Sequence, residues 1–177
     1  MSIEVVQISI SNKEIHKNLK EPYQVFGKLE MRFADGRWNY QETIFEKPYT
    51  KIYDENYIKV EEYISNENKT IFYALDNSLC VGQIVIRMNW NRFCFIEGIV
   101  VKEKARRKNV GTLLLNTAKN WAIARNLKGF MLEAQDNNLG ACRFYIKNGF
   151  VLGGVDIMLY NNFQNKDEKA LFWYKTF

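Results

Sequence analysis

The sequence predicts a mixed α+β fold (α/β in the broad sense), in which helices flank a central sheet. Three observations predict it. Alternating polar and apolar residues recur in short runs bounded by turn residues. One long segment has apolar residues at helical spacing, and helices alternate with strands in the C-terminal half. The predicted order is therefore strands first, then β-α-β-α-β-β. The 177 residues, 47% hydrophobic and 25% charged, suit one globular domain.

Short runs rich in β-branched and aromatic residues predict the strands, because Gly, Asn, Asp and Ser separate them. The pair Asp35-Gly36 between two alternating runs indicates a β-hairpin. In a later strand, Glu97-Gly98 interrupts an apolar run, which predicts a β-bulge. The predicted strands cover residues 25–33, 38–45, 71–76, 79–88, 93–101, 130–135, 150–160 and 170–177.

The clearest helix signal lies in residues 110–126. Leu114, Ala118, Trp121 and Ala122 recur there at helical spacing, and Asn and Gly residues come next as stop signals. Two shorter helices are predicted at residues 54–64 and 138–147.

Cysteine and histidine usage excludes several chemistries. Cys80, Cys94 and Cys142 are odd in number and lack CxxC spacing, so we expect reduced core thiols rather than disulfides or a zinc site. The single histidine, His16, lies far from any candidate nucleophile, which disfavours His-dependent triads and metal sites. No apolar run is long enough to span a membrane and residues 1–10 do not resemble a signal peptide, so the expected location is the cytoplasm, with no membrane partner.

The positive charge is concentrated in one short segment. The net charge is +5, and residues 102–108 hold five basic residues and one acid. Nucleic-acid-binding domains spread basic side chains over a face, so this confined run favours one compact anion site and no nucleic-acid partner. The alternative is a solvated basic loop.

The residues on either side of the basic run favour the anion site. The segment reads as strand, basic loop and helix, with Asn109 and Gly111 at the junction. A helix N-terminus presents unpaired N–H groups and partial positive charge, so this turn can hold a pyrophosphate. It has neither the Gly-Lys-Ser/Thr of a Walker loop nor the GxGxxG of a dinucleotide fold.

The residues from Arg106 to Gly111 (RRKNVG) resemble the acetyl-CoA loop of the GNAT N-acetyltransferase superfamily, Q/R-x-x-G-x-G/A, with Asn109 in place of the first glycine. Further motifs occur in the family's order: Ile99-Val100-Val101, Leu132-Glu133, and Asn138-x-x-Ala141-x-x-Phe144-Tyr145. The resemblance implies one acetyltransferase domain over residues 1–177, with about the first 50 residues on the substrate side. It also implies a mostly antiparallel, twisted and splayed sheet, acetyl-CoA as cosubstrate, and no metal.

Six further segments resemble the streptothricin acetyltransferases: residues 27–33, 46–53, 89–93, 131–138, 155–163 and 168–174. This resemblance implies acetylation of an amino group on the β-lysine side chain of streptothricin, and hence antibiotic resistance. An acetyltransferase for a protein or peptide amine or a polyamine, and a catalytically silent CoA-binding module, stay open as alternatives. A homodimer is also left open.

The same resemblance implies roles for individual residues. Glu133 or Glu97 is the expected general base, and Tyr145 the general acid that protonates the departing thiolate. The expected cofactor-binding residues are Ile99, Val100, Val101, Arg106, Arg107, Lys108, Asn109, Val110, Gly111, Thr112 and Asn138. A cationic substrate needs carboxylates and aromatic rings, for which Asp136, Asp156 and Tyr160 are candidates; ordinary loop acids and a strand tyrosine are the alternative.

Overall fold

The computed structural model describes residues 3–19, 21–52 and 58–177. The chain forms two compact units. The first unit comprises residues 1–21, 52–130 and 177, and the second comprises residues 22–51 and 131–176. Both combine antiparallel strands with helices, as the mixed α+β prediction expected.

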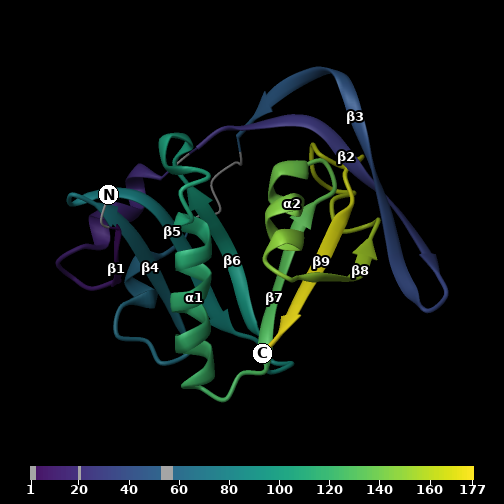
Figure 1. The fold of residues 1–177 in the computed structure, drawn as a ribbon. Coiled ribbons are helices and arrows are strands. Elements are labelled where there is room, and N and C mark those ends of the chain that lie inside the picture. Colours follow the sequence, from purple (N-terminus) through teal and green to yellow (C-terminus); the bar gives the residue numbers. More distant parts are fainter. Residues whose placement is uncertain (1–2, 20, 53–57) are drawn as a thin grey trace. The chain divides into compact units, whose positions relative to one another are not determined.

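The first unit is built on four strands that pair antiparallel in the order β1-β4-β5-β6. Helix α1 lies across one face of these strands (Figure 1). Side chains alternate along strand β5, and Val85 points to the face away from α1. There it packs in a core cluster with residues of the two short 3₁₀ helices η1 and η2. The elements are β1 (Ile3–Gln7), η1 (Lys13–Asn18), η2 (Val60–Tyr63), β4 (Lys69–Asp76), β5 (Leu79–Met88), β6 (Cys94–Val101), η3 (Glu103–Ala105) and α1 (Val110–Ile123).

The second unit holds a long hairpin and three strands that pair in the order β7-β9-β8. Helix α2 lies in front of β7 and β9 in Figure 1. Asp35 and Gly36 both have positive φ, at 54° and 72°, which is the hairpin turn that their residue types predict. The elements are β2 (Tyr23–Ala34), β3 (Arg37–Lys51), β7 (Gly129–Gln135), α2 (Leu139–Lys147), β8 (Val151–Asp156) and β9 (Ala170–Thr176).

Most predicted elements are confirmed, and the main differences are as follows. Strand β3, predicted over residues 38–45, extends to Lys51. The strand predicted over residues 150–160 ends at Asp156, because that carboxylate accepts hydrogen bonds from the backbone N–H groups of Met158 and Leu159 and closes a turn. The predicted helix 110–126 ends at Ile123. The helix predicted over residues 54–64 falls partly outside the described residues, and its described part holds only η2. Strand β1 was not predicted.

Two of the three cysteines lie in the core as expected, whereas Cys80 is only half-buried. All three are free, and Cys94 and Cys142 are buried. Burial raises the pKa of each of these two thiols to about 12. Over the described ranges, no helix combines the length and apolar character that a membrane crossing requires.

Candidate functional site

The bulge predicted at Glu97-Gly98 is confirmed in β6. Val85 of β5 pairs with Gly98 and the next residue, Ile86, pairs with Ile96, so Glu97 is the extra residue. Pairing with β5 continues beyond the bulge through residues 99–101. The bulge therefore turns the Glu97 side chain out of the regular alternation without ending the strand.

The Glu97 carboxylate is held by two neighbours. The Tyr63 hydroxyl donates to Glu97 Oε2 at 2.6 Å, and Arg87 Nε donates to Oε1 at 3.2 Å. Arg87 also donates to Asn89 Oδ1 at 2.9 Å. Burial, and then the hydrogen bond to Glu97, raise the pKa of Tyr63. Both carboxylate oxygens are thus engaged, one of them in an ion pair.

The basic loop before α1 has a left-handed backbone turn, which the predicted anion site needs. Asn109, in the place of the family's glycine, has φ 62° and is the N-cap residue, so its carbonyl accepts the first helical hydrogen bond from Leu113 N at 2.9 Å. Arg107 also has positive φ, at 61°, which its residue type did not predict. Asparagine tolerates this left-handed region better than most residues, so the substitution preserves the turn.

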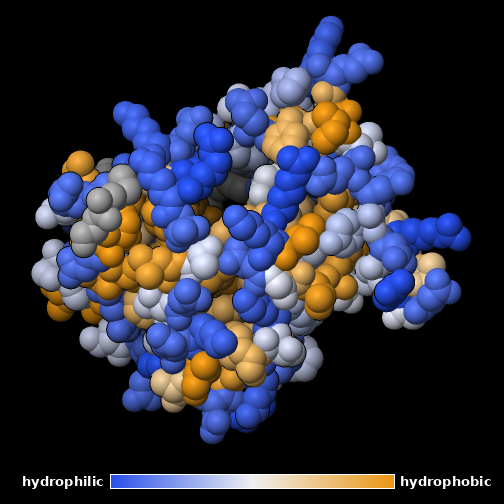
Figure 2. All heavy atoms as spheres, viewed as in Figure 1, coloured by the Kyte–Doolittle hydropathy of each residue, from blue (hydrophilic) through white to orange (hydrophobic). Residues whose placement is uncertain are grey.

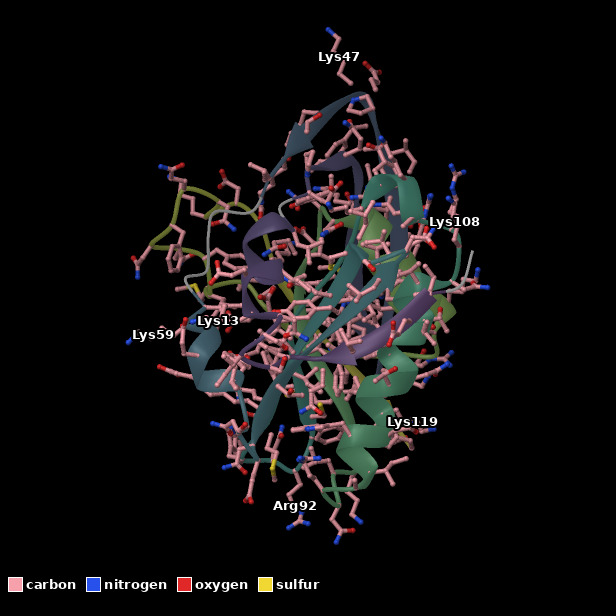
Figure 3. All side chains as sticks on the ribbon, turned by 90° about the vertical axis from the view of Figure 1, so that its left-hand side faces the viewer. Lys13, Lys47, Lys59, Arg92, Lys108 and Lys119 are labelled. Carbon is pink, nitrogen blue, oxygen red and sulfur yellow. The ribbon has the colours of Figure 1, made fainter. Side chains whose placement is uncertain are left out.

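Cations surround the start of this 14-residue helix, which has no acidic residue in its first turn. The side chains of Arg106, Arg107 and Lys108 are exposed, and Arg106 Nε donates to the Val101 carbonyl at 3.1 Å. Figure 2 shows hydrophilic side chains over this loop, and Figure 3 places Lys108 at the beginning of α1, far from Arg92 at its other end. Positive side chains and a helix N-terminus together favour a phosphate group here.

In the second unit, Glu133 of β7 forms a hydrogen-bonded chain with two neighbours. The Tyr160 hydroxyl donates to Glu133 Oε1, and Gln135 Nε2 donates to the same hydroxyl at 3.0 Å. Burial raises the pKa of Glu133, the Tyr160 hydrogen bond lowers it, and the charge of Glu168 raises it further; the net shift is upward. A glutamate with a raised pKa binds a proton more readily than an ordinary glutamate, which is the property that a general base needs.

The three residues predicted to bind substrate have structural contacts of their own. Tyr160 is buried, in a turn rather than a strand, and its hydroxyl contacts Glu133. Asp156 Oδ1 accepts from the backbone N–H of Met158 at 2.7 Å. Asp136 is buried, its Oδ1 accepts from Lys169 N at 3.1 Å, and burial raises its pKa. Their contacts with a substrate remain predictions.

Helix α2 carries the two remaining predicted residues. Asn138 is its N-cap, with Oδ1 accepting from Ala141 N at 3.2 Å. Tyr145 lies about two turns further along the helix. It is 7% exposed and packs against the rings of Phe150 and Trp173, with centroids 5.6 and 6.3 Å away. This packing fixes the orientation of the phenol.

A polar cluster in the second unit was missed by sequence reasoning. Glu168 forms an ion pair with Lys51 at 2.5 Å and accepts from Asn137 Nδ2 and Asn165 Nδ2, both at 2.9 Å. Burial opposes ionisation of Glu168, but the bonds from Lys51, Asn165 and Asn137 outweigh it and lower its pKa. Lys51 and Asn137 are far from Glu168 in the sequence, so the spacing of these residues does not indicate that they meet.

Comparison with known proteins adds independent findings. Residues 36–150 match the model of the acetyltransferase (GNAT) family. Streptothricin acetyltransferase A of Bacillus subtilis (strain 168) is 45% identical over 172 residues, which cover 93% of this chain and 98% of that protein. N-alpha-acetyltransferase 30 of Xenopus laevis is 30% identical over 109 residues, covering 54% of this chain and 40% of that protein. A crystal structure from Bacillus anthracis str. Ames, in complex with acetyl coenzyme A, superposes with a TM-score of 0.90 at 34% identity, over 100% of this chain and 98% of that one.

Proposed function

The chain belongs to the GNAT acetyltransferase family, and from that premise we propose that it transfers the acetyl group of acetyl-CoA to an amino group of the β-lysine side chain of streptothricin, which inactivates the antibiotic. The observation that carries this proposal is the 45% identity to streptothricin acetyltransferase A of Bacillus subtilis over 93% of this chain. That match covers 93% of this chain, so it is not confined to the family's cofactor motifs.

Acetyl-CoA supplies the acetyl group as a reactive thioester, and the loop before α1 fits its pyrophosphate. The left-handed Asn109 turn, the cations of Arg106, Arg107 and Lys108, and the N–H groups of the first turn, Val110, Gly111 and Thr112, favour a bound anion. We assign the backbone of Ile99, Val100 and Val101 to the pantetheine arm and to the oxyanion of the transition state, and the Asn138 amide to the pantetheine amides.

We assign the general base to Glu133 rather than Glu97. An alkyl ammonium has a pKa of about 10, so most acceptor molecules are protonated at neutral pH. The ammonium must lose a proton before its nitrogen can attack. Glu133 has a raised pKa and a neutral hydrogen-bond donor, Tyr160. Glu97, in contrast, is ion-paired with Arg87. The Tyr63 hydroxyl and the Arg87 guanidinium already engage both carboxylate oxygens of Glu97.

The remaining groups complete the transfer. Glu133 accepts a proton from the acceptor ammonium, and the neutral amine nitrogen then bonds to the thioester carbonyl carbon. The nitrogen loses its second proton as the tetrahedral intermediate collapses. When the C–S bond breaks, the Tyr145 hydroxyl gives its proton to the departing thiolate, whose basicity it matches. The rings of Phe150 and Trp173 pack against Tyr145 and orient its phenol.

The acceptor is a cation, and the second unit offers carboxylates for it. We keep Asp136 and Asp156 as substrate residues and assign Tyr160 a second role as the donor that orients Glu133. The whole of residues 1–177 is proposed to work as one acetyltransferase domain, in which the β2–β3 hairpin contributes to the substrate side.

Release of free CoA from acetyl-CoA tests the proposal. Streptothricin, spermidine, an aminoglycoside and a lysine-terminated peptide are compared in parallel, with Tyr145→Phe as a variant. We expect turnover with streptothricin alone, and a kcat in Tyr145→Phe lower by about 10²-fold, the size of a general-acid contribution. Tight acetyl-CoA binding without turnover of any acceptor would instead support a silent module.

The match to N-alpha-acetyltransferase 30 favours one competing acceptor, a peptide α-amine. That match covers only 54% of this chain, against 93% for the streptothricin acetyltransferase. A peptide acetylated faster than streptothricin would keep the family assignment and overturn the proposed substrate.

A further inference from the structure

The proposed function leaves the extra residue of the β6 bulge, Glu97, without a role. Its neighbour Gly98 does not have a positive φ, and a Cβ added there would meet no described atom within 4 Å beyond its chain neighbours. Neither backbone conformation nor crowding therefore requires glycine at this position. Glycine makes the backbone more flexible, so other contacts have to fix the shape of the bulge.

Two side chains from different elements hold the Glu97 carboxylate, one on each oxygen. Tyr63, at the end of η2, donates its hydroxyl to Oε2 at 2.6 Å, and Arg87 Nε, from β5, donates to Oε1 at 3.2 Å. The ring of Tyr63 is 7% exposed and packs in the core cluster. Glu97 is thus tied both to the core and to the neighbouring strand.

Arg87 is fixed in its turn by further contacts. Its guanidinium lies over the ring of Phe95, 4.6 Å from the centroid, and donates to Asn89 Oδ1 at 2.9 Å. Asn89 Nδ2 donates to Asn91 Oδ1 at 3.0 Å, which links the turn over residues 89–93 to the bulge. The Arg87 and Glu97 side chains are 37% and 26% exposed, and ion pairs this exposed contribute little to stability. The network therefore fixes the geometry of the Glu97 side chain more than it stabilises the fold.

We propose that Arg87 is a positioning residue for acetyl transfer: it acts through the Glu97 carboxylate, with Tyr63 on the other oxygen, to hold the bulge in the shape that orients the backbone of residues 99–101 toward acetyl-CoA. This inference rests on the proposed function, in which that backbone binds the pantetheine arm and the oxyanion. Ile99 is two positions beyond Glu97, so the path from the bulge is short. Oxyanion donors act at about 2.7–3.1 Å, so a small change in the bulge affects the transfer.

A double-mutant cycle tests the proposal, with kcat and KM for acetyl-CoA measured at saturating streptothricin. Arg87→Met keeps an apolar stem against Phe95 and removes the donor to Glu97. We expect kcat/KM for acetyl-CoA to fall by about 10- to 100-fold, the upper value being the cost of a misplacement of about 1 Å. Glu97→Ala should lose at least as much. The double variant should be no worse than Glu97→Ala, because Arg87 acts through Glu97.

Tyr63→Phe probes the other oxygen of the same carboxylate. It keeps the ring in the core and removes only the hydroxyl that donates to Glu97. We expect it to lower kcat/KM for acetyl-CoA in the wild-type background and to have no further effect in the Glu97→Ala background. Should Arg87→Met fail to fold, as judged by circular dichroism, this pair of variants gives the same test.

Arg125→Met is the matched control. The Arg125 guanidinium also lies over an aromatic ring, 4.1 Å from the centroid of Trp121, and its Nε also donates, to the Glu67 carbonyl at 2.7 Å. Neither of these partners belongs to β6. We therefore expect wild-type kinetics from Arg125→Met.

Three outcomes would overturn the inference. Losses of Arg87→Met and Glu97→Ala that add in the double variant would mean that the two residues act separately. A rise in KM for streptothricin, with kcat and KM for acetyl-CoA unchanged, would make Glu97 an acceptor-binding residue. An acidic limb of the kcat profile that disappears in Glu97→Ala would make Glu97 the base in place of Glu133.

Binding of acetyl-CoA without an acceptor separates this inference from the proposed substrate. Isothermal titration calorimetry measures that affinity in wild type, Arg87→Met and Arg125→Met. Weaker binding in Arg87→Met alone supports the positioning role even if another amine proves to be the acceptor. Equal affinity in all three, together with wild-type kcat in Arg87→Met, overturns it.

Discussion

The hydrogen bond from Tyr160 to Glu133 gives the sharpest prediction about catalysis. Tyr160→Phe keeps the ring, which is 8% exposed, and removes only the hydroxyl that donates to Glu133 and accepts from Gln135. That bond stabilises the carboxylate anion and so lowers the pKa of Glu133, against the larger upward effect of burial. Without it the pKa of Glu133 rises further.

The size of the shift can be worked out from the bond that is lost. A hydrogen bond to a charged group is worth about 1.5–3 kcal/mol, and one pKa unit corresponds to about 1.4 kcal/mol. The proposed base acts only when deprotonated, so the proposal predicts that the acidic limb of the kcat profile moves to higher pH by about one to two units. At a fixed pH on that limb, kcat falls by about 10- to 100-fold.

Stopped-assay CoA release from pH 5 to pH 9 measures the limb. Tyr73→Phe is the control, because the Tyr73 hydroxyl is buried and has no hydrogen-bond partner within the part of the chain that the structure describes. The control should keep the wild-type limb. If the limb of Tyr160→Phe stays in place or moves to lower pH, Tyr160 does not stabilise the ionised base and the reasoning fails.

Three further predictions concern the loop, the bulge and the thiols. Asn109→Ala puts a residue that disfavours φ 62° into the turn, so it should lower the free energy of unfolding by about 1–2 kcal/mol and raise KM for acetyl-CoA. Asn109→Gly should leave both quantities at their wild-type values. Equal KM values in the two variants would contradict this prediction. Glu97→Gln should leave the acidic limb in place and cost no more than about 1 kcal/mol of stability in a urea titration, because its ion pair is partly exposed. When the native protein is treated with a thiol reagent, Cys80 should react first, and Cys94 and Cys142 should react only on unfolding. Fast labelling of all three thiols would contradict the burial of Cys94 and Cys142.

The local features of the fold could be predicted from the sequence because short-range chemistry determines them. Asp35-Gly36 and Asn77-Ser78 all have positive φ in the turns that their residue types predict. The bulge at Glu97 was predicted from a Glu-Gly interruption in an apolar run. The left-handed backbone of Asn109 suits its residue type, because asparagine tolerates positive φ better than most residues.

Long-range polar contacts could not be predicted in the same way. Lys51 and Glu168 are 117 positions apart, and nothing in the spacing of either residue indicates the other. Tyr160 was assigned to a strand because its neighbours alternate, but the Asp156 side chain closes a turn that redirects the chain. The hydroxyl then reaches Glu133, a contact that the sequence did not predict.

A competition between two acceptors tests the central claim most directly. Streptothricin and a peptide with a free α-amine are mixed at equal concentration with limiting acetyl-CoA, and mass spectrometry measures the ratio of the two acetylated products. That ratio equals the ratio of the two kcat/KM values. We predict that streptothricin takes nearly all of the acetyl groups, on its β-lysine side chain. A majority of acetyl groups on the peptide would contradict the proposed function.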